Sequence, residues 1–226
     1  MEVTFYGHSC FLINIRDTNI LFDPFISGNE LAKGIEINSI KADYVLLSHG
    51  HQDHILDALT IAKNNNATLV SNFEIINWYA KQGYEKGQAL NQGGSWKFDF
   101  GKVKYVNAIH TSGLPDGSYG GNPGGFIVTV GETEIYFAGD TALTLDMELI
   151  GLYNLVDLAF LPIGDCFTMG VDDAVIASDY IKCDQIVGMH YDTFPPIKID
   201  KAEAIAKFDD AGKELILFEI GETKTF

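Results

Sequence analysis

The segment 48–54, SHGHQDH, constrains this chain more than any other part of its sequence. It holds three of the six histidines of the chain and one aspartate: His49, His51, Asp53 and His54. The run before it, DYVLLS, is apolar and strand-like, and the run after it, ILDALTIAKNN, has apolar residues at helical spacing. The pattern predicts a buried strand, then a loop that carries the cluster, then a helix.

These residue types point to metal binding, because divalent transition metals prefer imidazole nitrogens and carboxylate oxygens as ligands. His49 and His51 are two positions apart in the loop, so both can turn toward one ion. Asp53 and His54 follow at the start of the helix and point differently, so they can reach a second ion. The cluster therefore predicts two metal centres, each of which needs further ligands.

Further candidate ligands stand where other predicted strands end. His110 ends the run VKYVNAIH, Asp140 ends TEIYFAGD, and His190 ends QIVGMH. Strand ends at one edge of a sheet converge on one crevice, so we predict that these three residues complete the metal site. The alternative for each histidine is a core residue with a satisfied ring, and the alternative for the aspartate is a turn.

The rest of the chain is read as short strands interleaved with helices. Strands are expected at VTFYG, CFLINI, NILF, ATLVS, WKFDF, GFIVTV, VDLAFLP and ELILFEI, and helices over 73–83, 144–153, 172–182 and 200–211. The strands outnumber what one open sheet would comfortably hold. We predict an α+β (αββα) fold, with two packed mixed β-sheets forming a sandwich, helices on both outer faces, and a single domain over 1–226.

The segment 111–125, TSGLPDGSYGGNPGG, is a predicted loop of unusual length with six glycines and two prolines. Long loops in compact domains are often binding loops or lids, and Tyr119 is its candidate contact residue. A simple hairpin connection is the alternative.

The bulk composition limits partners and compartment. A net charge of −16 repels nucleic acid and leaves few phosphate contacts, so a nucleic-acid substrate is disfavoured. Cys10, Cys166 and Cys183 have no disulfide-like spacing and are interpreted as buried small residues. Neither a leader pattern nor a membrane-spanning run is recognisable, so a cytoplasmic location without membrane contact is expected.

In this order the motifs resemble the metallo-β-lactamase superfamily. The resemblance rests on HGHQDH, the isolated His110, the aspartate of AGDT and the late GMH, with ILFDPF upstream. YGHSCFLI, GGNPGGFIV and FLPIGDCFTMG resemble, more closely, the UPF0173-like branch of metal-dependent hydrolases similar to ascorbate-6-phosphate lactonases. Asp165 and the run VDDA depart from that branch, which leaves the substrate open.

The resemblance implies a dinuclear hydrolase. Its ligand set consists of His49, His51 and His110 on one ion, Asp53, His54 and His190 on the other, and Asp140 between the two. A metal-bridging hydroxide, oriented by Asp53, would attack a small ester, lactone or phosphoester. Asp23 of ILFDPF would support the ligands, and its alternative is a turn former before Pro24.

His8 is the remaining histidine, in the run YGHSC. We expect it to face the metal site as an extra ligand, a substrate contact or a catalytic proton donor. Its alternative is a histidine that bonds to a neighbouring loop.

Several points stay open at this level. Zn²⁺ is favoured, and Mn²⁺, Fe²⁺ or Ni²⁺ also suit these ligands. Because two cations outweigh the nearby carboxylate and hydroxide charges, a small anionic substrate is expected. A phosphodiesterase or nuclease of the same superfamily and a non-catalytic metal-binding protein are the alternative functions, and a homo-oligomer is left open.

Overall fold

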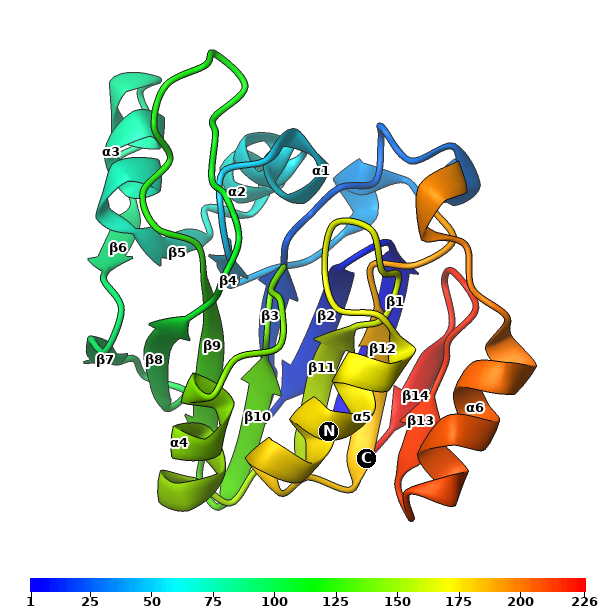
Figure 1. Cartoon of the computed structure of the whole chain (residues 1–226). Helices are drawn as coiled ribbons and strands as arrows, with labels where there is room; N and C mark the ends of the chain where they lie inside the picture. The colour runs from blue at the N-terminus through cyan, green and yellow to red at the C-terminus, as the bar shows by residue number, and fades with distance from the viewer. The chain divides into compact units, whose positions relative to one another are not determined.

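The computed structural model describes every residue from Met1 to Phe226, and the chain divides into two compact units (Figure 1). Unit 1 comprises Met1–Gly94, Thr111–Pro123 and Phe218–Phe226, and unit 2 comprises Ser95–His110 and Gly124–Leu217. Each unit contains one of the two seven-stranded sheets. The expectation of one domain over 1–226 stays a prediction.

The sheet of unit 1 has the strand order β14-β1-β2-β3-β4-β5-β6. Its strands are β1 (Glu2–Gly7), β2 (Cys10–Ile15), β3 (Thr18–Phe22), β4 (Tyr44–Leu46), β5 (Thr68–Asn72), β6 (Gly87–Leu90) and β14 (Thr223–Thr225). Pairing is antiparallel from β14 to β3 and parallel from β3 to β6. The parallel strand β4 leads directly into the histidine cluster.

Helices of unit 1 follow its parallel strands. They are α1 (Gln52–Ile55), α2 (Ala58–Asn65) and α3 (Phe73–Lys81), with short 3₁₀ turns η1 (Glu30–Ala32) and η2 (Ile37–Ser39). The helix expected over 55–65 is interrupted after α1, because the Asp57 carboxylate accepts hydrogen bonds from the backbone N–H groups of Ile26 and Ser27. Asn72 caps α3 by accepting from Ile75 N.

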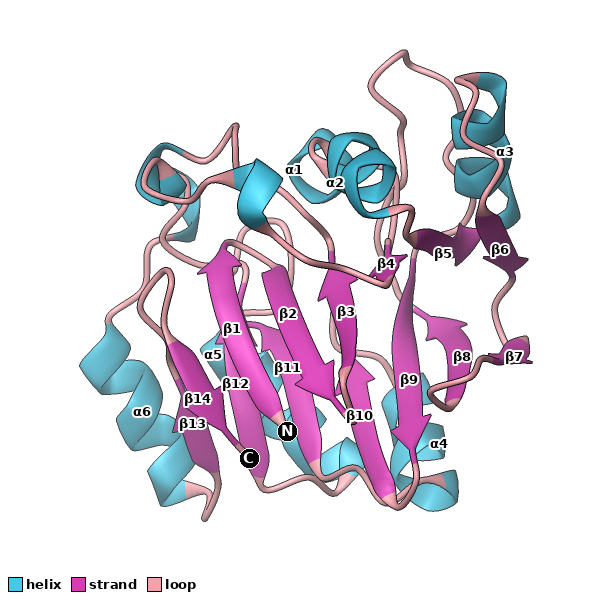
Figure 2. Ribbon diagram, turned by 180° about the vertical axis from the view of Figure 1, so that it is seen from behind, coloured by secondary structure: helices cyan, strands magenta, loops and turns pink.

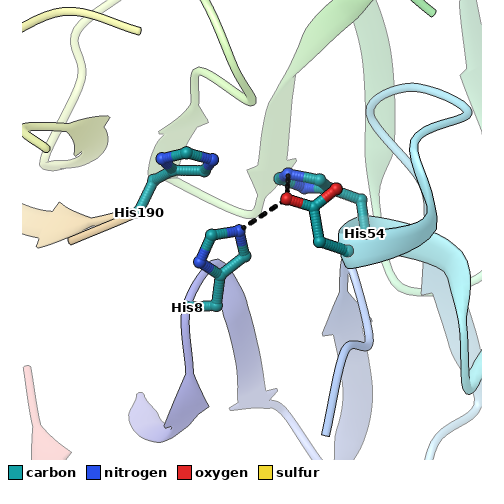
Figure 3. A group of neighbouring side chains, drawn as sticks. His8, His54 and His190 are labelled. Carbon is teal, nitrogen blue, oxygen red and sulfur yellow. Dashed lines mark hydrogen bonds and ion pairs between the residues drawn. The ribbon is translucent and has the colours of Figure 1, made fainter. Parts of the chain in front are cut away.

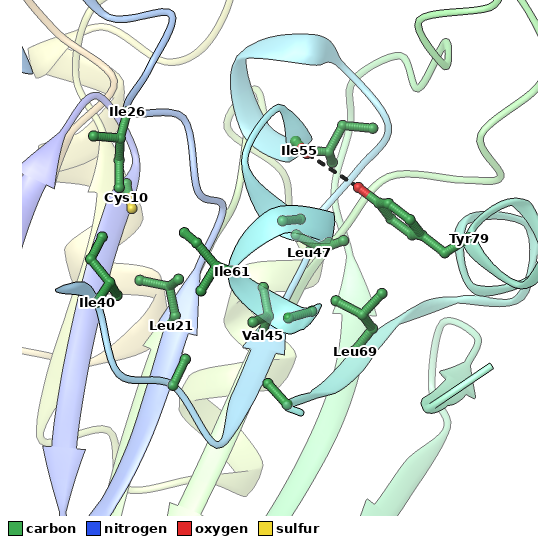
Figure 4. Close-up of a cluster of buried hydrophobic side chains, with 14 of the residues drawn as sticks. Cys10, Leu21, Ile26, Ile40, Val45, Leu47, Ile55, Ile61, Leu69 and Tyr79 are labelled. Atoms are coloured by element: carbon green, nitrogen blue, oxygen red, sulfur yellow. Dashed lines mark hydrogen bonds between the residues drawn. The ribbon is translucent and has the colours of Figure 1, made fainter. Parts of the chain in front are cut away.

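The core of unit 1 packs these helices onto the sheet (Figure 4). Leu21, Val45 and Leu69 project from β3, β4 and β5 and are buried, as is Ile61 of α2. Tyr79 of α3 is buried too, and its hydroxyl donates to the carbonyl of Ile55 at 3.2 Å. This contact ties α3 to the end of α1 and so braces the helix that carries two candidate ligands.

The sheet of unit 2 has the strand order β13-β12-β11-β10-β9-β8-β7. Its strands are β7 (Ser95–Lys97), β8 (Lys102–Asn107), β9 (Gly124–Val130), β10 (Thr133–Phe137), β11 (Leu158–Pro162), β12 (Gln185–Met189) and β13 (Glu214–Ile216). Strands β7 to β10 pair antiparallel and β10 to β13 pair parallel. Strands β7 and β8 form one hairpin, and β9 and β10 form another.

Three helices of unit 2 lie along one face of its sheet (Figures 1 and 2). They are α4 (Asp146–Tyr153), α5 (Val171–Ile181) and α6 (Lys201–Asp210), and the 3₁₀ turn η3 (Pro195–Ile197) precedes α6. The sequence predicts all three within two residues of these bounds. None of the helices in the chain combines the length and the apolar character that a membrane crossing requires.

The C-terminal run ELILFEI is not one strand, as expected, because β13 ends at Ile216 and the chain enters unit 1 at Phe218. There Phe218 packs with Phe5 and Phe11, at ring-centroid distances of 6.2 and 6.0 Å. The first part of the apolar run thus packs in the core of unit 2 and Phe218 packs in the core of unit 1, so the strand ends between them.

Candidate metal centre

The histidine cluster of unit 1 lies where β4 ends. Ser48, His49 and His54 are buried, and His51 is half-buried. His49 and His51 stand in the loop, whereas Asp53 and His54 belong to α1, which begins at Gln52. The predicted order of strand, loop and helix is confirmed.

Asp23, just after β3, organises this loop. One of its carboxylate oxygens accepts from Ser48 N at 2.7 Å, and the other accepts from the Ser48 hydroxyl at 2.5 Å. His54 Nδ1 lies 2.8 Å from that second oxygen. Complete burial raises the pKa of Asp23, and the bonds from His54 and Ser48 oppose this rise. Asp23 is therefore placed to support two histidines, as the resemblance implies.

The same contacts select the tautomers of His49 and His54. Because the Ser48 hydroxyl gives its proton to Asp23, its 2.9 Å contact with His49 Nδ1 requires that this nitrogen donates. His54 Nδ1 likewise donates to Asp23. In both rings Nε2 is then the unprotonated atom that a metal ion needs.

His51 uses its other nitrogen. Its Nε2 lies 3.2 Å from Thr111 Oγ1, and its Nδ1 lies 3.0 Å from His49 Nε2. Two nitrogens bound to one tetrahedral Zn²⁺ at roughly 2.0–2.1 Å would be about 3.3 Å apart. The spacing of the two imidazoles therefore fits ligands of a common ion.

His8 lies in the tight turn between β1 and β2, where its φ is +57°. Its Nε2 is 3.2 Å from Asp53 Oδ2, and His54 Nε2 is 4.0 Å from the same oxygen (Figure 3). Donor atoms of these three residues lie within 4.8 Å of one another. A buried histidine in a left-handed turn is unusual, and such strain is concentrated at functional sites.

In unit 2, His110, Asp140 and His190 follow β8, β10 and β12. His110 Nε2 lies 3.5 Å and His190 Nε2 lies 3.0 Å from the same oxygen, Asp140 Oδ2. Both histidines thus lie beside the Asp140 carboxylate, so the structure brings these three strand-end residues together. A carboxylate that faces two imidazoles is a suitable bridging ligand.

Two local features position this group. Ile109 N donates to Thr141 Oγ1 at 3.0 Å, which joins the chain next to His110 to the chain next to Asp140. Beside His190, a Cβ at Gly164 would lie 2.1 Å from the His190 carbonyl oxygen, so only glycine allows this approach. The FLPIGDCFTMG run therefore packs directly against a candidate ligand.

The glycine-rich segment of unit 1 is tied down at its base. The Ser112 hydroxyl accepts from Gly50 N at 3.0 Å and donates to the Gly120 carbonyl at 2.8 Å. The Asn72 amide also donates to Gly120 O, at 2.7 Å. Tyr119 is exposed at the tip and donates to Asn122 Oδ1. The segment is thus anchored to the loop that carries His49 and His51, and β9 begins at Gly124.

The three cysteines and Asp165 lie outside the groups of candidate ligands. Cys10 and Cys183 are buried, but Cys166 is exposed, so the prediction that all three cysteines are buried is wrong. Cys166 follows Asp165 in a tight turn in which both have positive φ, and this turn directs the thiol outward. Asp165 lines a cavity of about 500 Å³ beside the first turns of α5 and α6, and none of the candidate ligands lines this cavity.

Both units supply imidazoles and carboxylates, which are the donors that divalent metal ions require, and in unit 1 the tautomers of His49 and His54 are defined. Sequence reasoning missed Ser48 and Thr111, which orient His49 and His51. The signals for them are their positions directly before the HxHxDH motif and directly after His110.

Comparison with known proteins identifies the family of this chain. Residues 2–190 match the beta-lactamase superfamily domain. The chain is 59% identical to a UPF0173 metal-dependent hydrolase of Christiangramia forsetii, over 99% of each chain, and 44% identical to YtkL of Bacillus subtilis, again over 99% of each. The structure of Igni18, a metallo hydrolase from Ignicoccus hospitalis, has a TM-score of 0.90 at 34% identity and covers 100% of this chain and 97% of its own.

The predicted fold class is confirmed by this structural match and by the two mixed seven-stranded sheets with their helices. The chain belongs to the metallo-β-lactamase superfamily and, within it, to the UPF0173 metal-dependent hydrolases.

Proposed function

We propose that the chain is a dinuclear metal-dependent hydrolase that acts on a small ester, lactone or phosphoester, with Zn²⁺ as the favoured metal, in the cytoplasm. The observation that carries the proposal is the set of orienting contacts in unit 1. Asp23 and Ser48 leave Nε2 of His49 and of His54 unprotonated, as a metal ligand must be, and Thr111 Oγ1 contacts Nε2 of His51. A histidine on the solvated surface with no ligand to bind would not need hydrogen bonds that fix the position of its proton.

The proposed ligands come from both units, following the family resemblance. They are His49, His51, His110, Asp53, His54, His190 and the bridging Asp140. When bound, two divalent cations would polarise the substrate and lower the pKa of water. The excess positive charge favours a small anionic substrate.

Asp53 and His8 are the proposed catalytic residues. The side chain of Asp53 is 30% exposed, so solvent and substrate can reach its carboxylate, which can accept a proton. His8 Nε2 faces that carboxylate at 3.2 Å and can hold a proton there for a leaving group. This contact supports the proposal that His8 takes part in proton transfer.

The test compares the wild-type protein with His110→Ala and Asp140→Asn. Metal content is measured by mass spectrometry, and turnover is measured on chromogenic esters, lactones and phosphodiesters with and without a chelator. About two metal ions per chain are expected in the wild type. Both variants are expected to lose metal and at least about 100-fold in activity.

Asp99→Asn is the matched control, because Asp99 is exposed between β7 and β8 and the chemical change is the same as in Asp140→Asn. Wild-type protein without metal, or variants that keep both metal and activity, would rule out the ligand assignment. Metal binding without turnover on any substrate would instead favour a non-catalytic metal-binding protein.

A further inference from the structure

Helix α4 of unit 2 is largely apolar on its outer as well as its inner side, with two acidic residues in its first turn. Met147, Ile150 and Gly151 are buried, yet the opposite side is also apolar and lies in solvent. We call the following exposed residues the α4 face: three from α4, the flanking Leu145 and Leu155, and one from α5, which packs against α4, that is Leu149, Leu152, Tyr153, Leu145, Leu155 and Ile176. A helix that is hydrophobic all round is normally buried all round, so this face is typical of a surface that another molecule covers.

The helix cannot rotate to hide these side chains. A Cβ at Gly151 would lie only 2.3 Å from the carbonyl oxygen of Tyr180, so α4 packs with its backbone directly on the end of α5. This close contact fixes which side of α4 faces inward. Leu149 and Leu152 must therefore point outward, where they are 53% and 62% exposed.

The α4 face is large enough for a stable interface. Tyr153 and Leu155 are 81% and 87% exposed, and Leu145 is 68% exposed. Together the six side chains expose on the order of 800 Å², which is what one partner buries in an interface of standard size and more than the usual largest apolar patch of a monomer.

We propose that the α4 face binds the α4 face of a second copy of this chain, so that the protein is a two-fold symmetric homodimer. A two-fold axis places the same patch on both sides of the interface, which suits a surface that is apolar throughout its centre. A charged partner would find little to pair with, since the helix carries only Asp146 and Glu148, both in its first turn.

The placement of these two acids also favours a second copy in an antiparallel arrangement. Eight residues of α-helix are about 12 Å long, so an antiparallel pair keeps the acidic first turns of the two copies at opposite ends. The acids of one copy then lie beside Tyr153 and Leu155 of the other copy. No like charges face each other at the centre of the interface.

Because each copy carries a large net charge, the dissociation constant of the dimer should depend on the salt concentration. Two chains of −16 repel each other at long range, whereas the apolar contact is insensitive to ionic strength. Raising NaCl from about 50 mM to about 500 mM should therefore tighten the dimer. A complex with a basic partner would weaken under the same change.

The experiment measures mass by sedimentation equilibrium for the wild type and for the double variant Leu149→Glu/Leu152→Glu. The double variant should raise the dissociation constant of the dimer roughly 100-fold or more. The control is Leu31→Glu/Phe73→Glu in unit 1. Leu31 and Phe73 are 56% and 55% exposed, so this control replaces two similarly exposed apolar side chains and adds the same charge. The control should dimerise like the wild type.

Disulfide cross-linking tests the geometry without a loss of folding. In a Cys166→Ser background, Leu152→Cys should form a covalent dimer on mild oxidation, and Leu31→Cys should not. A wild type that stays monomeric at millimolar concentration would overturn the proposal, as would a dimer that the double variant leaves intact. Binding of monomers to phosphatidylcholine vesicles through the same leucines would also overturn it.

Discussion

The imidazoles of the candidate site are prepared for a metal ion by their neighbours. Asp23 receives a hydrogen bond from the Ser48 hydroxyl and lies 2.8 Å from His54 Nδ1, so one buried carboxylate determines the proton positions of two rings. His8 differs from these residues, because its backbone is held at a positive φ that asparagine or glycine would adopt with less strain. The chemical role proposed for His8 would account for a histidine at this position.

His8→Asn separates these two requirements. Asparagine tolerates the left-handed turn, so the thermal unfolding temperature should stay the same or rise slightly. The proposed proton transfer is lost with the ring, so kcat should fall roughly 10²- to 10⁴-fold. Arg16→Asn is the control, since Arg16 has a φ of +49° in the next turn, between β2 and β3. Equal effects of the two variants on kcat would contradict a catalytic role for His8.

At the scale of elements, the sequence predicts the strand-to-helix step at the histidine cluster because apolar periodicity and residue type agree there. It does not predict the break between α1 and α2, which depends on Asp57 accepting from residues 26 and 27, far away in the sequence. Strand β14 is also missed, because its residues, TKT, are polar and it forms only by pairing with β1. The roles of Ser48 and Thr111 are not predicted either, since they depend on the contacts of these side chains with His49 and His51 in the folded chain.

The glycine-rich segment gives an element-scale prediction. Hydrogen bonds from Ser118 and then from the indole of Trp78 lower the pKa of Asp116 to about 2. A carboxyl whose native pKa is depressed keeps its contacts as pH falls below its unfolded value and loses them only near the native one. In a Trp96→Phe background, Trp78 emission should therefore stay constant down to about pH 3 while circular dichroism remains native.

Asp116→Ala is the control for that titration. Its Trp78 emission should already be shifted at neutral pH, because the indole loses its acceptor. A transition centred near pH 4 in the parent, with native circular dichroism, would show that the carboxylate is not held as the structure indicates.

For the whole molecule, the two units follow one plan. Each sheet has an antiparallel half and a parallel half, and each places candidate ligands after its strands. The sequence predicts both ligand sets by residue type, but not the division of the chain into three segments of one unit and two of the other. That division depends on contacts between residues far apart in the sequence.

Metal removal should destabilise the whole chain. An ion that binds only the folded protein adds about 2.7 kcal/mol when its concentration is 100 times its dissociation constant. For a chain of this length, this corresponds to a fall of roughly 5–10 °C in Tm on chelation. Scanning calorimetry with EDTA, and after addition of excess Zn²⁺, measures the change and its reversal. The Asp140→Asn variant should show no response, and a wild type that is indifferent to EDTA would argue against bound metal.

The segmented layout of unit 1 also bears on how the chain folds as it leaves the ribosome. Strand β1 is made more than 200 residues before its partner β14, with Glu2 opposite Thr225. The Phe218 ring, which is tilted against that of Phe5 and packs edge-on against that of Phe11, arrives equally late. Until then the nascent chain carries an open sheet edge and an incomplete aromatic core, both of which favour aggregation. Folding during synthesis should therefore depend on chaperones that shield β1 and its neighbours until Phe218 and β14 emerge.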